Sequence, residues 1–114
     1  MIWAPGQDTP IHDHDGAWGV ESTWHGELQA TGFLATGQRD DLFRLEAQDT
    51  VRLGVGAAAG LEPEQGLHIC RNPSPSSVAL TVHIYARPLE AFHVYAAAGD
   101  GWYRREAFLP ALER

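Results

Sequence analysis

Residues Pro5–Gly19, PGQDTPIHDHDGAWG, carry the most distinctive pattern in this sequence. Its two histidines, His12 and His14, are two positions apart, so an extended backbone directs both side chains to one face. Neutral imidazoles that converge from one strand suit a first-row transition metal better than calcium or magnesium, which prefer oxygen ligands. Turn signals at Pro5-Gly6 and Asp15-Gly16 predict that the strand carrying the pair is short. A polar strand face or a loop with incidental histidines is the alternative, and the spacing alone leaves both open.

The composition limits the classes of protein to consider. A chain of 114 residues fits a single domain, 1–114, with room for one core. Eight arginines, no lysine and fifteen acidic residues give a net charge of −7, which argues against nucleic-acid binding because that needs a basic stripe. One cysteine excludes an internal disulfide and fits a reducing cytoplasm.

No segment of the sequence predicts a membrane anchor or a secretion signal. The nearly uncharged run Leu53 to Leu61 is rich in glycine and alanine and far too short to cross a bilayer. The N-terminus lacks the basic and apolar regions of a signal peptide. We therefore expect no contact with a membrane and a cytoplasmic location.

Short alternating runs separated by turns predict an all-β protein. Trp18–Trp24 alternates with a period of two, and His25-Gly26-Glu27 then turns the chain into a second run, giving a hairpin. Val78–Tyr85 is the most β-branched run. The other expected strands are residues 1–4, 28–35, 42–46, 51–55, 66–71, 91–97 and 102–107. Turns are expected at residues 37–41 and 48–49, a loop at 56–65 and one helical turn at 107–114. Eight or nine short strands with almost no helix predict a sandwich or barrel.

Two groups of residues resemble the two cupin motifs. The first group consists of Gly6, His12-x-His14, Gly19 and Gly26, and the second of Pro63, Gly66, His68 and Asn72. Cupins usually have a glutamate ligand at the position of Gly19 and a glycine at that of Gln65. The two motifs occur in the right order and at a plausible separation. The resemblance therefore implies an all-β cupin double-stranded β-helix, a small jelly-roll barrel, with His68 at the place of the third ligand.

Within the cupins, the sequence most resembles the cysteine dioxygenase family of thiol dioxygenases. The resemblance covers Trp3 to about Tyr95, and its remaining motifs are Pro5-Gly6, Thr9–His14, Trp18-Gly19, Gly66–His68, Asn72-Pro73 and Thr81–Tyr85. It implies one Fe(II) on His12, His14 and His68, with nickel or zinc able to occupy the site in a purified sample. It also implies an outer relay on one strand face, with Tyr85 nearest the metal, His83 behind it, and Thr81 where the family often has serine.

The physical chemistry of such a site agrees with the activity that the resemblance implies. Three neutral imidazoles leave the iron its full double charge, which suits an anionic thiolate, whereas most non-haem iron oxygenases use one carboxylate ligand. The partners would be a small thiol and O2, and the product a sulfinate. Tyr85 could donate a hydrogen bond to oxygen or substrate, with its phenol oriented by His83. The alternative for His83 and Tyr85 is a satisfied buried pair in a barrel core.

Two departures from the family concern the substrate. Animal members link a cysteine at the Gly19 position to the tyrosine, and a glycine there excludes this crosslink. The family holds the substrate carboxylate upstream of the first histidine, with arginine in enzymes that use cysteine and glutamine in those that prefer mercaptopropionate. Only eleven residues precede His12, so we expect a short form without that segment. Gln7, Arg71 and Arg87 are the candidates to replace the clamp.

Several other residues admit two interpretations. Glu21 could face inward as a fallback ligand, or pair across strands with an arginine. Cys70 could approach the metal from the face of His68, or be a small buried hydrophobe. His93 is a further ligand candidate or a core or surface histidine, and His25 is expected in an exposed turn. The four tryptophans are expected to be core or interface aromatics: Trp3, Trp18, Trp24 and Trp102.

Three functions remain open from the sequence. The first is an Fe(II)-dependent thiol dioxygenase for a small thiol acid of the cysteine or 3-mercaptopropionate type, which the relay on residues 81, 83 and 85 favours. The second is another metal-dependent cupin enzyme, such as an oxygenase or an isomerase. The third is a non-enzymatic metal- or ligand-binding cupin, a sensor or a remnant, which the short N-terminus favours. An uncovered edge at Met1–Ala4 further predicts a homodimer.

Overall fold

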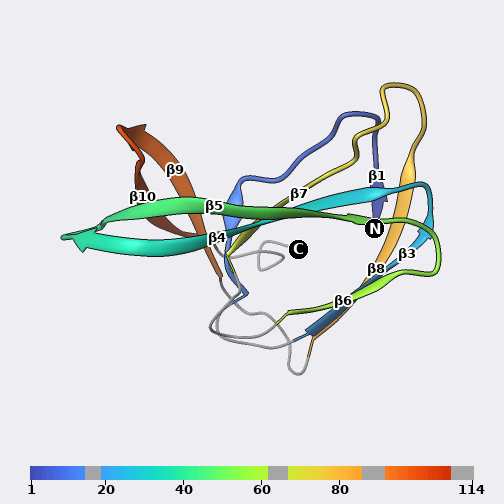
Figure 1. The fold of residues 1–114 in the computed structure, drawn as a ribbon, viewed down its shortest axis with the longest axis horizontal. Helices are drawn as coiled ribbons and strands as arrows, with labels where there is room; N and C mark the ends of the chain where they lie inside the picture. Colours follow the sequence, from blue (N-terminus) through green and yellow to red (C-terminus); the bar gives the residue numbers. More distant parts are fainter. Residues whose placement is uncertain (15–18, 62–66, 86–91, 109–114) are drawn as a thin grey trace.

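The computed structural model describes residues 1–14, 19–61, 67–85 and 92–108, and these ranges contain ten strands and no helix (Figure 1). The strands are β1 (Ile2–Trp3), β2 (Ile11–His12), β3 (Gly19–His25), β4 (Leu28–Arg39), β5 (Leu42–Leu53), β6 (Ala58–Leu61), β7 (His68–Arg71), β8 (Ala79–Tyr85), β9 (Phe92–Gly99) and β10 (Trp102–Phe108). The all-β class predicted from the alternation is confirmed.

The strands form two antiparallel units. Six of them close into a barrel in the order β10-β5-β4-β7-β2-β9, and the other four form a sheet in the order β1-β8-β3-β6. In Figure 1 the long β4–β5 hairpin runs across the molecule, with β9 and β10 at one end and the four-stranded sheet at the other. The fold thus contains a strongly curved and a flatter sheet, as a jelly roll does.

The alternation in β3 decides which of its residues face the interior. Gly19, Glu21 and Thr23 are buried, while Val20 and Trp24 are exposed. Antiparallel pairing with β8 places Glu21 opposite His83 and Gly19 opposite Tyr85. Because one face of the sheet is buried, a shift of one residue in this register would move every inward side chain to the outer face.

Two clusters of buried side chains form the core of the described residues. One contains Trp3, Leu28, Leu53, Cys70 and Ala79, and the other Ile11, Leu45 and Tyr95. Trp3 and Leu28 are almost completely shielded from solvent. Two of the chain's four tryptophans depart from a core role, because Trp24 is exposed and Trp102 lies half-buried beneath two arginines, Arg39 and Arg44.

The β4–β5 hairpin is longer than the sequence pattern predicted. β5 continues through the expected turn at Gln48-Asp49, because β4 pairs with it from Leu28↔Leu53 to Arg39↔Leu42. The register shifts twice along the hairpin, between Thr31 and Phe33, where β5 has the extra residue, and between Ala35 and Gly37, where β4 has it. The predicted turn at 37–41 shrinks to a tight turn at Asp40, whose φ of 56° is left-handed.

Two further expectations about secondary structure need correction. The expected loop at 56–65 contains strand β6, because Ala58 and Ala59 pair with Ser22 and Glu21 of β3. The expected helical turn at 107–114 begins in the last two residues of β10, and residues 109–114 lie outside the described ranges.

The described part of the chain has no helix with the length and apolarity that a membrane crossing requires.

Candidate metal centre

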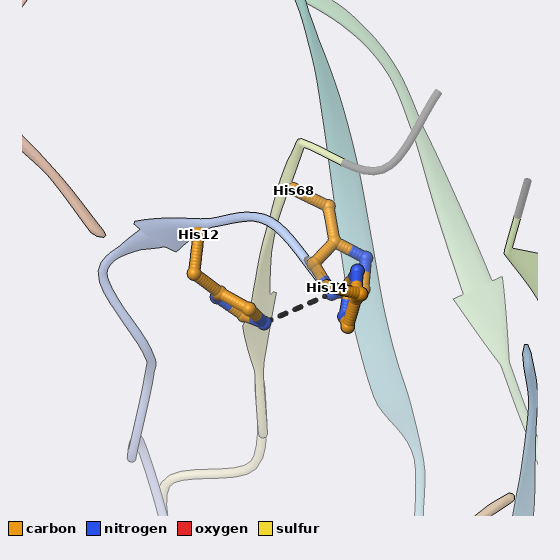
Figure 2. Close-up of side chains that lie close together, drawn as sticks. All are labelled: His12, His14 and His68. Atoms are coloured by element: carbon orange, nitrogen blue, oxygen red, sulfur yellow. Dashed lines mark hydrogen bonds between the residues drawn. The ribbon is translucent and has the colours of Figure 1, made fainter. Parts of the chain in front are cut away.

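Three histidines converge although they come from distant parts of the sequence (Figure 2). His12 lies in β2, directly opposite His68 at the start of β7, and His14 follows two residues after His12. One ring nitrogen from each of the three lies within 4.8 Å of the others. His14 and His68 are buried and His12 is half-buried. The structure therefore brings together the three residues that the sequence nominated as ligands.

The hydrogen bonds of His12 fix which of its nitrogens faces the cluster. Its Nδ1 donates to the carbonyl oxygen of Pro10 at 2.9 Å, so Nε2 carries the lone pair. This Nε2 lies 3.2 Å from Nε2 of His68, the contact dashed in Figure 2. Two imidazole nitrogens on one transition metal are separated by about 3.0 Å in octahedral and about 3.4 Å in tetrahedral geometry, given metal–nitrogen bonds of about 2.0–2.1 Å. The donor set and its spacing thus fit one transition-metal ion.

The electrostatics of the cluster keep its imidazoles in the form that binds metals. Burial, assisted by the charges that His12, His14 and His83 would carry, lowers the pKa of His68 to about 3. Burial also lowers the pKa of His12, despite the opposing effects of Pro10 and Asp13. His12 and His68 are therefore neutral at pH 7, with no proton to displace before a metal binds.

The four-stranded sheet contributes Thr81, His83 and Tyr85 from one face of β8. Thr81 Oγ1 lies 2.8 Å from His83 Nε2 and accepts a hydrogen bond from Trp3 Nε1 at 2.9 Å. Because the hydroxyl oxygen accepts from Trp3, its own proton is available to His83. The buried Trp3 side chain anchors this chain of hydrogen bonds, a role that sequence reasoning did not identify.

Tyr85 lies beside the cluster, with its ring centroid 5.6 Å from that of His14. Burial, together with the charges of Glu21 and Cys70, raises the pKa of its phenol to about 12, so the hydroxyl keeps its proton at neutral pH. Among the described residues, no hydrogen bond joins this hydroxyl to His83, whose Nδ1 instead lies 3.4 Å from Glu21 Oε2.

Gly19 allows the close approach of Tyr85 to the strand opposite it. A Cβ atom at this position would lie 2.6 Å from the Ile84 carbonyl oxygen and 2.7 Å from Tyr85 Cδ1. Neither contact is compatible with a real side chain while Tyr85 keeps this position. The departure from the glutamate and cysteine of relatives therefore has a local steric reason.

Glu21 and Cys70 both lie next to His68. Glu21 is buried, and burial raises the pKa of its carboxyl group to about 7. The arginine partner expected for Glu21 was wrong, since its cross-strand partner within the described ranges is His83. Cys70 is a buried core residue and also approaches the cluster, with Sγ 3.6 Å from His68 Nε2.

Another histidine–carboxylate pair stabilises the loop after β2. His93 pairs with Asp13 and not with the three-histidine cluster. Its Nδ1 is 2.9 Å from Asp13 Oδ2, and its backbone nitrogen donates a hydrogen bond to Asp13 Oδ1 at 2.8 Å. This clamp ties β9 to the residue between His12 and His14. No local pattern predicts this clamp, because the two partners are 80 positions apart.

The second motif also contains a structural residue, Asn72, which is buried. Its Nδ2 donates to the carbonyl oxygens of Trp3, Ala4 and Ser77, and its Oδ1 accepts from Ser74. The asparagine therefore holds the turn after β7 against β1. The motif residues Trp18, Pro63, Gln65 and Gly66 lie outside the described ranges.

The candidates for a carboxylate clamp are not gathered at the cluster. Arg71 is exposed and forms a backbone bridge with Asp8. Gln7 is also exposed and accepts a hydrogen bond from Ala4. Arg87 lies outside the described part of the chain, and His25 is exposed as expected.

A cavity of about 230 Å³ lies beside His12, lined also by Thr9, Pro10, Phe92 and Val94. The surface that these residues present to the cavity is apolar. The phenyl ring of Phe92 lies 6.1 Å from the His12 ring, centroid to centroid. An apolar part of a small molecule could therefore be accommodated next to one of the three imidazoles.

Solved structures of other proteins share the fold. Drosophila melanogaster CENP-C bound to CAL1 is similar with a TM-score of 0.56 and 17% identity, over 75% of this chain and 58% of that one. Oxalate oxidase in complex with the substrate analogue glycolate has a TM-score of 0.51 and 24% identity, over 74% of this chain and 38% of that one. This chain thus spans 58% and 38% of the lengths of these two proteins, and the likenesses concern the fold alone. They confirm the predicted cupin double-stranded β-helix.

The family assignment rests on a match over most of the chain and not on the two cupin motifs alone. The family model described as cysteine dioxygenase type I matches residues 1–98. This range includes the three clustered histidines and the Thr81, His83 and Tyr85 positions. The resemblance seen in the motifs is confirmed: the chain belongs to the cysteine dioxygenase type I family.

Proposed function

We propose that this protein is an Fe(II)-dependent thiol dioxygenase that converts a small thiol acid, of the cysteine or 3-mercaptopropionate type, to its sulfinate. Both atoms of O2 are transferred to sulfur, so that RSH + O2 gives RSO2H; the sulfur loses four electrons and O2 gains them. The observation that carries the proposal is the convergence of three histidines, two of them held neutral by burial, with a protonated phenol beside them.

His12, His14 and His68 would hold the metal in this proposal. Bound iron would supply the coordination positions at which thiolate and O2 meet and the electrons that activate O2. The three residues leave no carboxylate among the ligands, which preserves the positive charge that attracts a thiolate. The Nδ1–H···O=C bond from His12 to Pro10 keeps one imidazole oriented toward the metal before it binds.

Tyr85 would donate a hydrogen bond to the reacting sulfur or oxygen. Its raised pKa keeps the proton on the phenol, so it acts as a donor and not as a ligand. Gly19 leaves the ring room to lie beside His14. The Trp3–Thr81–His83 hydrogen bonds hold the neighbouring part of β8 in place. The cavity beside His12 is suited to the carbon chain of the thiol.

The test is oxygen consumption by iron-loaded protein with cysteine, cysteamine and 3-mercaptopropionate, each supplied separately. We expect one of the thiol acids to give stoichiometric O2 uptake and a product heavier by two oxygen atoms in mass spectrometry. The zinc-loaded protein is the matched control and should consume no O2, since zinc has no redox chemistry. Absence of uptake with every thiol by fully iron-loaded protein would contradict the proposal.

One observation favours a second candidate, a non-enzymatic metal-binding cupin. The two ring nitrogens of His83 face Thr81 and Glu21, so His83 gives Tyr85 no hydrogen bond within the described residues. A protein that only binds a metal has no need of an oriented phenol. This candidate predicts tight metal binding without oxygen uptake, and the same assay separates it from the dioxygenase.

A further inference from the structure

A second group of potential ligands shares His68 with the three-histidine cluster. Cys70 is two residues further along β7, and Glu21 comes from β3 of the facing sheet. One ligand atom each from Glu21, His68 and Cys70 lies within 4.8 Å of the others, and all three residues are buried. The set mixes a carboxylate, an imidazole and a thiol, whereas the first cluster is purely histidine.

The Glu21 carboxylate is in an environment that calls for a cation. The residue is 1% exposed, and neither of its oxygens accepts a hydrogen bond from any described residue. His83 Nδ1 lies 3.4 Å from Glu21 Oε2, which is longer than a charge-assisted hydrogen bond. Buried carboxylates without hydrogen bonds or a counter-charge are strongly unfavourable, and a metal ion would satisfy both oxygens.

The spacing of the sulfur and nitrogen atoms matches a tetrahedral site. Cys70 Sγ lies 3.6 Å from His68 Nε2 and 3.9 Å from its Nδ1. A thiolate sulfur and an imidazole nitrogen on one tetrahedral zinc are separated by about 3.5 Å, given bonds of about 2.3 Å and 2.0–2.1 Å. A carboxylate oxygen of Glu21 lies within 4.8 Å of both atoms.

We propose that Glu21, His68 and Cys70 form a second metal position that takes zinc or a similar divalent ion with an affinity for thiolate. Cys70 loses its thiol proton to solvent on binding, as a metal-bound cysteine must. His68 Nε2 cannot bind two ions at once, so the second position alternates with the three-histidine cluster. Zinc bound there removes His68 from that cluster and lowers its capacity for another metal.

Cobalt(II) titration tests the proposal, because a cobalt–thiolate bond gives a charge-transfer absorption in the near ultraviolet. The starting protein is the double variant His12→Ala, His14→Ala, in which the three-histidine cluster is broken. We expect it to bind one cobalt per chain with this absorption. Adding Cys70→Ala should abolish the absorption, and adding Glu21→Gln should weaken binding about tenfold or more, since one ligand charge is lost. The control Glu106→Gln, on an exposed residue, should change nothing.

A double variant that is folded by circular dichroism and binds no cobalt, or binds it without the sulfur band, would overturn the proposal. If that variant does not fold, X-ray absorption at the zinc edge of the zinc-loaded wild-type protein tests whether sulfur is among the zinc ligands. A sulfur neighbour at about 2.3 Å supports the second position, and a shell of nitrogen and oxygen alone overturns it. Neither measurement uses a thiol substrate or iron, so their outcome is independent of the dioxygenase assay.

Discussion

The two walls around the candidate site differ in the kind of chemistry that they present. The barrel wall, from β2, β7 and the residues after β2, presents the imidazole nitrogens of His12, His14 and His68. The sheet wall, from β3 and β8, presents groups that carry protons: Glu21, Thr81, His83 and Tyr85.

The difference meets two separate requirements of the proposed dioxygenase site, which needs unprotonated metal ligands and protonated hydrogen-bond donors. Burial lowers the pKa of His12 and His68 on the barrel wall, which leaves bare lone pairs at neutral pH. The same burial raises the pKa of Glu21 to about 7 and that of Tyr85 to about 12, which retains protons on the sheet wall. One low-dielectric interior therefore yields metal-binding bases on one side and hydrogen-bond donors on the other, because it suppresses charge on both.

Removing His68 should have the largest effect, because it is the one residue common to both proposed metal positions. We expect His68→Ala to reduce bound metal from about one per chain to below a tenth, through a loss of at least ~100-fold in affinity. Elemental analysis after dialysis measures this, with the exposed His25→Ala as control. Unchanged metal content in the His68 variant would place the metal elsewhere.

Tyr85→Phe distinguishes the role of the sheet wall from that of the barrel wall. It should lower turnover without changing the iron content. Loss of one hydrogen bond to the reacting group costs about 1–3 kcal/mol, or roughly tenfold to a hundredfold in rate. Tyr103→Phe, a half-buried tyrosine of β10, is the control. His83→Ala should show a smaller loss, because its ring nitrogens face Thr81 and Glu21 and not the phenol. Full activity in Tyr85→Phe would remove the phenol from the mechanism.

Glu21→Gln should change the pH dependence of stability of the metal-free protein. The pKa of the Glu21 carboxyl group is about 7 in the folded protein, against a reference value of 4.5 for the unfolded chain. Between pH 4.5 and 7 the folded protein therefore binds a proton that the unfolded chain has lost. Its contribution to stability is therefore full below pH 4.5 and lost as pH rises through 7. Because glutamine does not ionise, the variant should gain up to about 3 kcal/mol relative to wild type between pH 4.5 and 8.

Urea unfolding of both proteins at several pH values measures this difference. Glu106→Gln, on the exposed face of β10, should show a difference that does not change with pH. A constant difference for the Glu21 variant as well would mean that burial does not retain the proton on this carboxyl group.

Trp3→Phe should have the smallest effect, a loss of about 1–2 kcal/mol in unfolding free energy. It removes the hydrogen bond from Trp3 Nε1 to Thr81 and some buried area. Trp24→Phe is the matched control, because Trp24 is 63% exposed and the change should stay within about 0.5 kcal/mol. Thermal or urea unfolding measures both, and equal effects would argue against the hydrogen bond as the cause.

The local pattern of the sequence was sufficient for the parts of the fold that repeat with a period of two. The alternation in Trp18–Trp24 predicted a strand, and in β3 the alternate residues Gly19, Glu21 and Thr23 are buried. The i, i+2 spacing of His12 and His14, together with the second motif, nominated three histidines that the structure brings together.

The errors arise where pairing between distant residues decides the structure. Gln48-Asp49 reads as a turn, yet the ladder with β4, including a 2.7 Å hydrogen bond between Thr31 and Thr50, keeps the strand continuous. The partners of Glu21 and Trp3 could not be predicted for the same reason, since Trp3 meets Thr81 across 78 positions. No periodicity encodes such contacts, which depend on the order in which the strands pair.

The shortness of β2 links barrel closure to the histidine cluster. This two-residue strand joins β7 through the pair His12↔His68 and β9 through Ile11↔Tyr95 and His12↔Val94. Strands with so few ladder bonds detach in local openings, which amide hydrogen exchange detects. An opening of this kind separates His12 from His68 and at the same time breaks the pairing of β2 with β7 and β9 that closes the barrel. An ion held by the cluster is therefore also a crosslink across 56 positions of the chain, and at a concentration 1,000 times its Kd it would stabilise the closed barrel by about 4 kcal/mol.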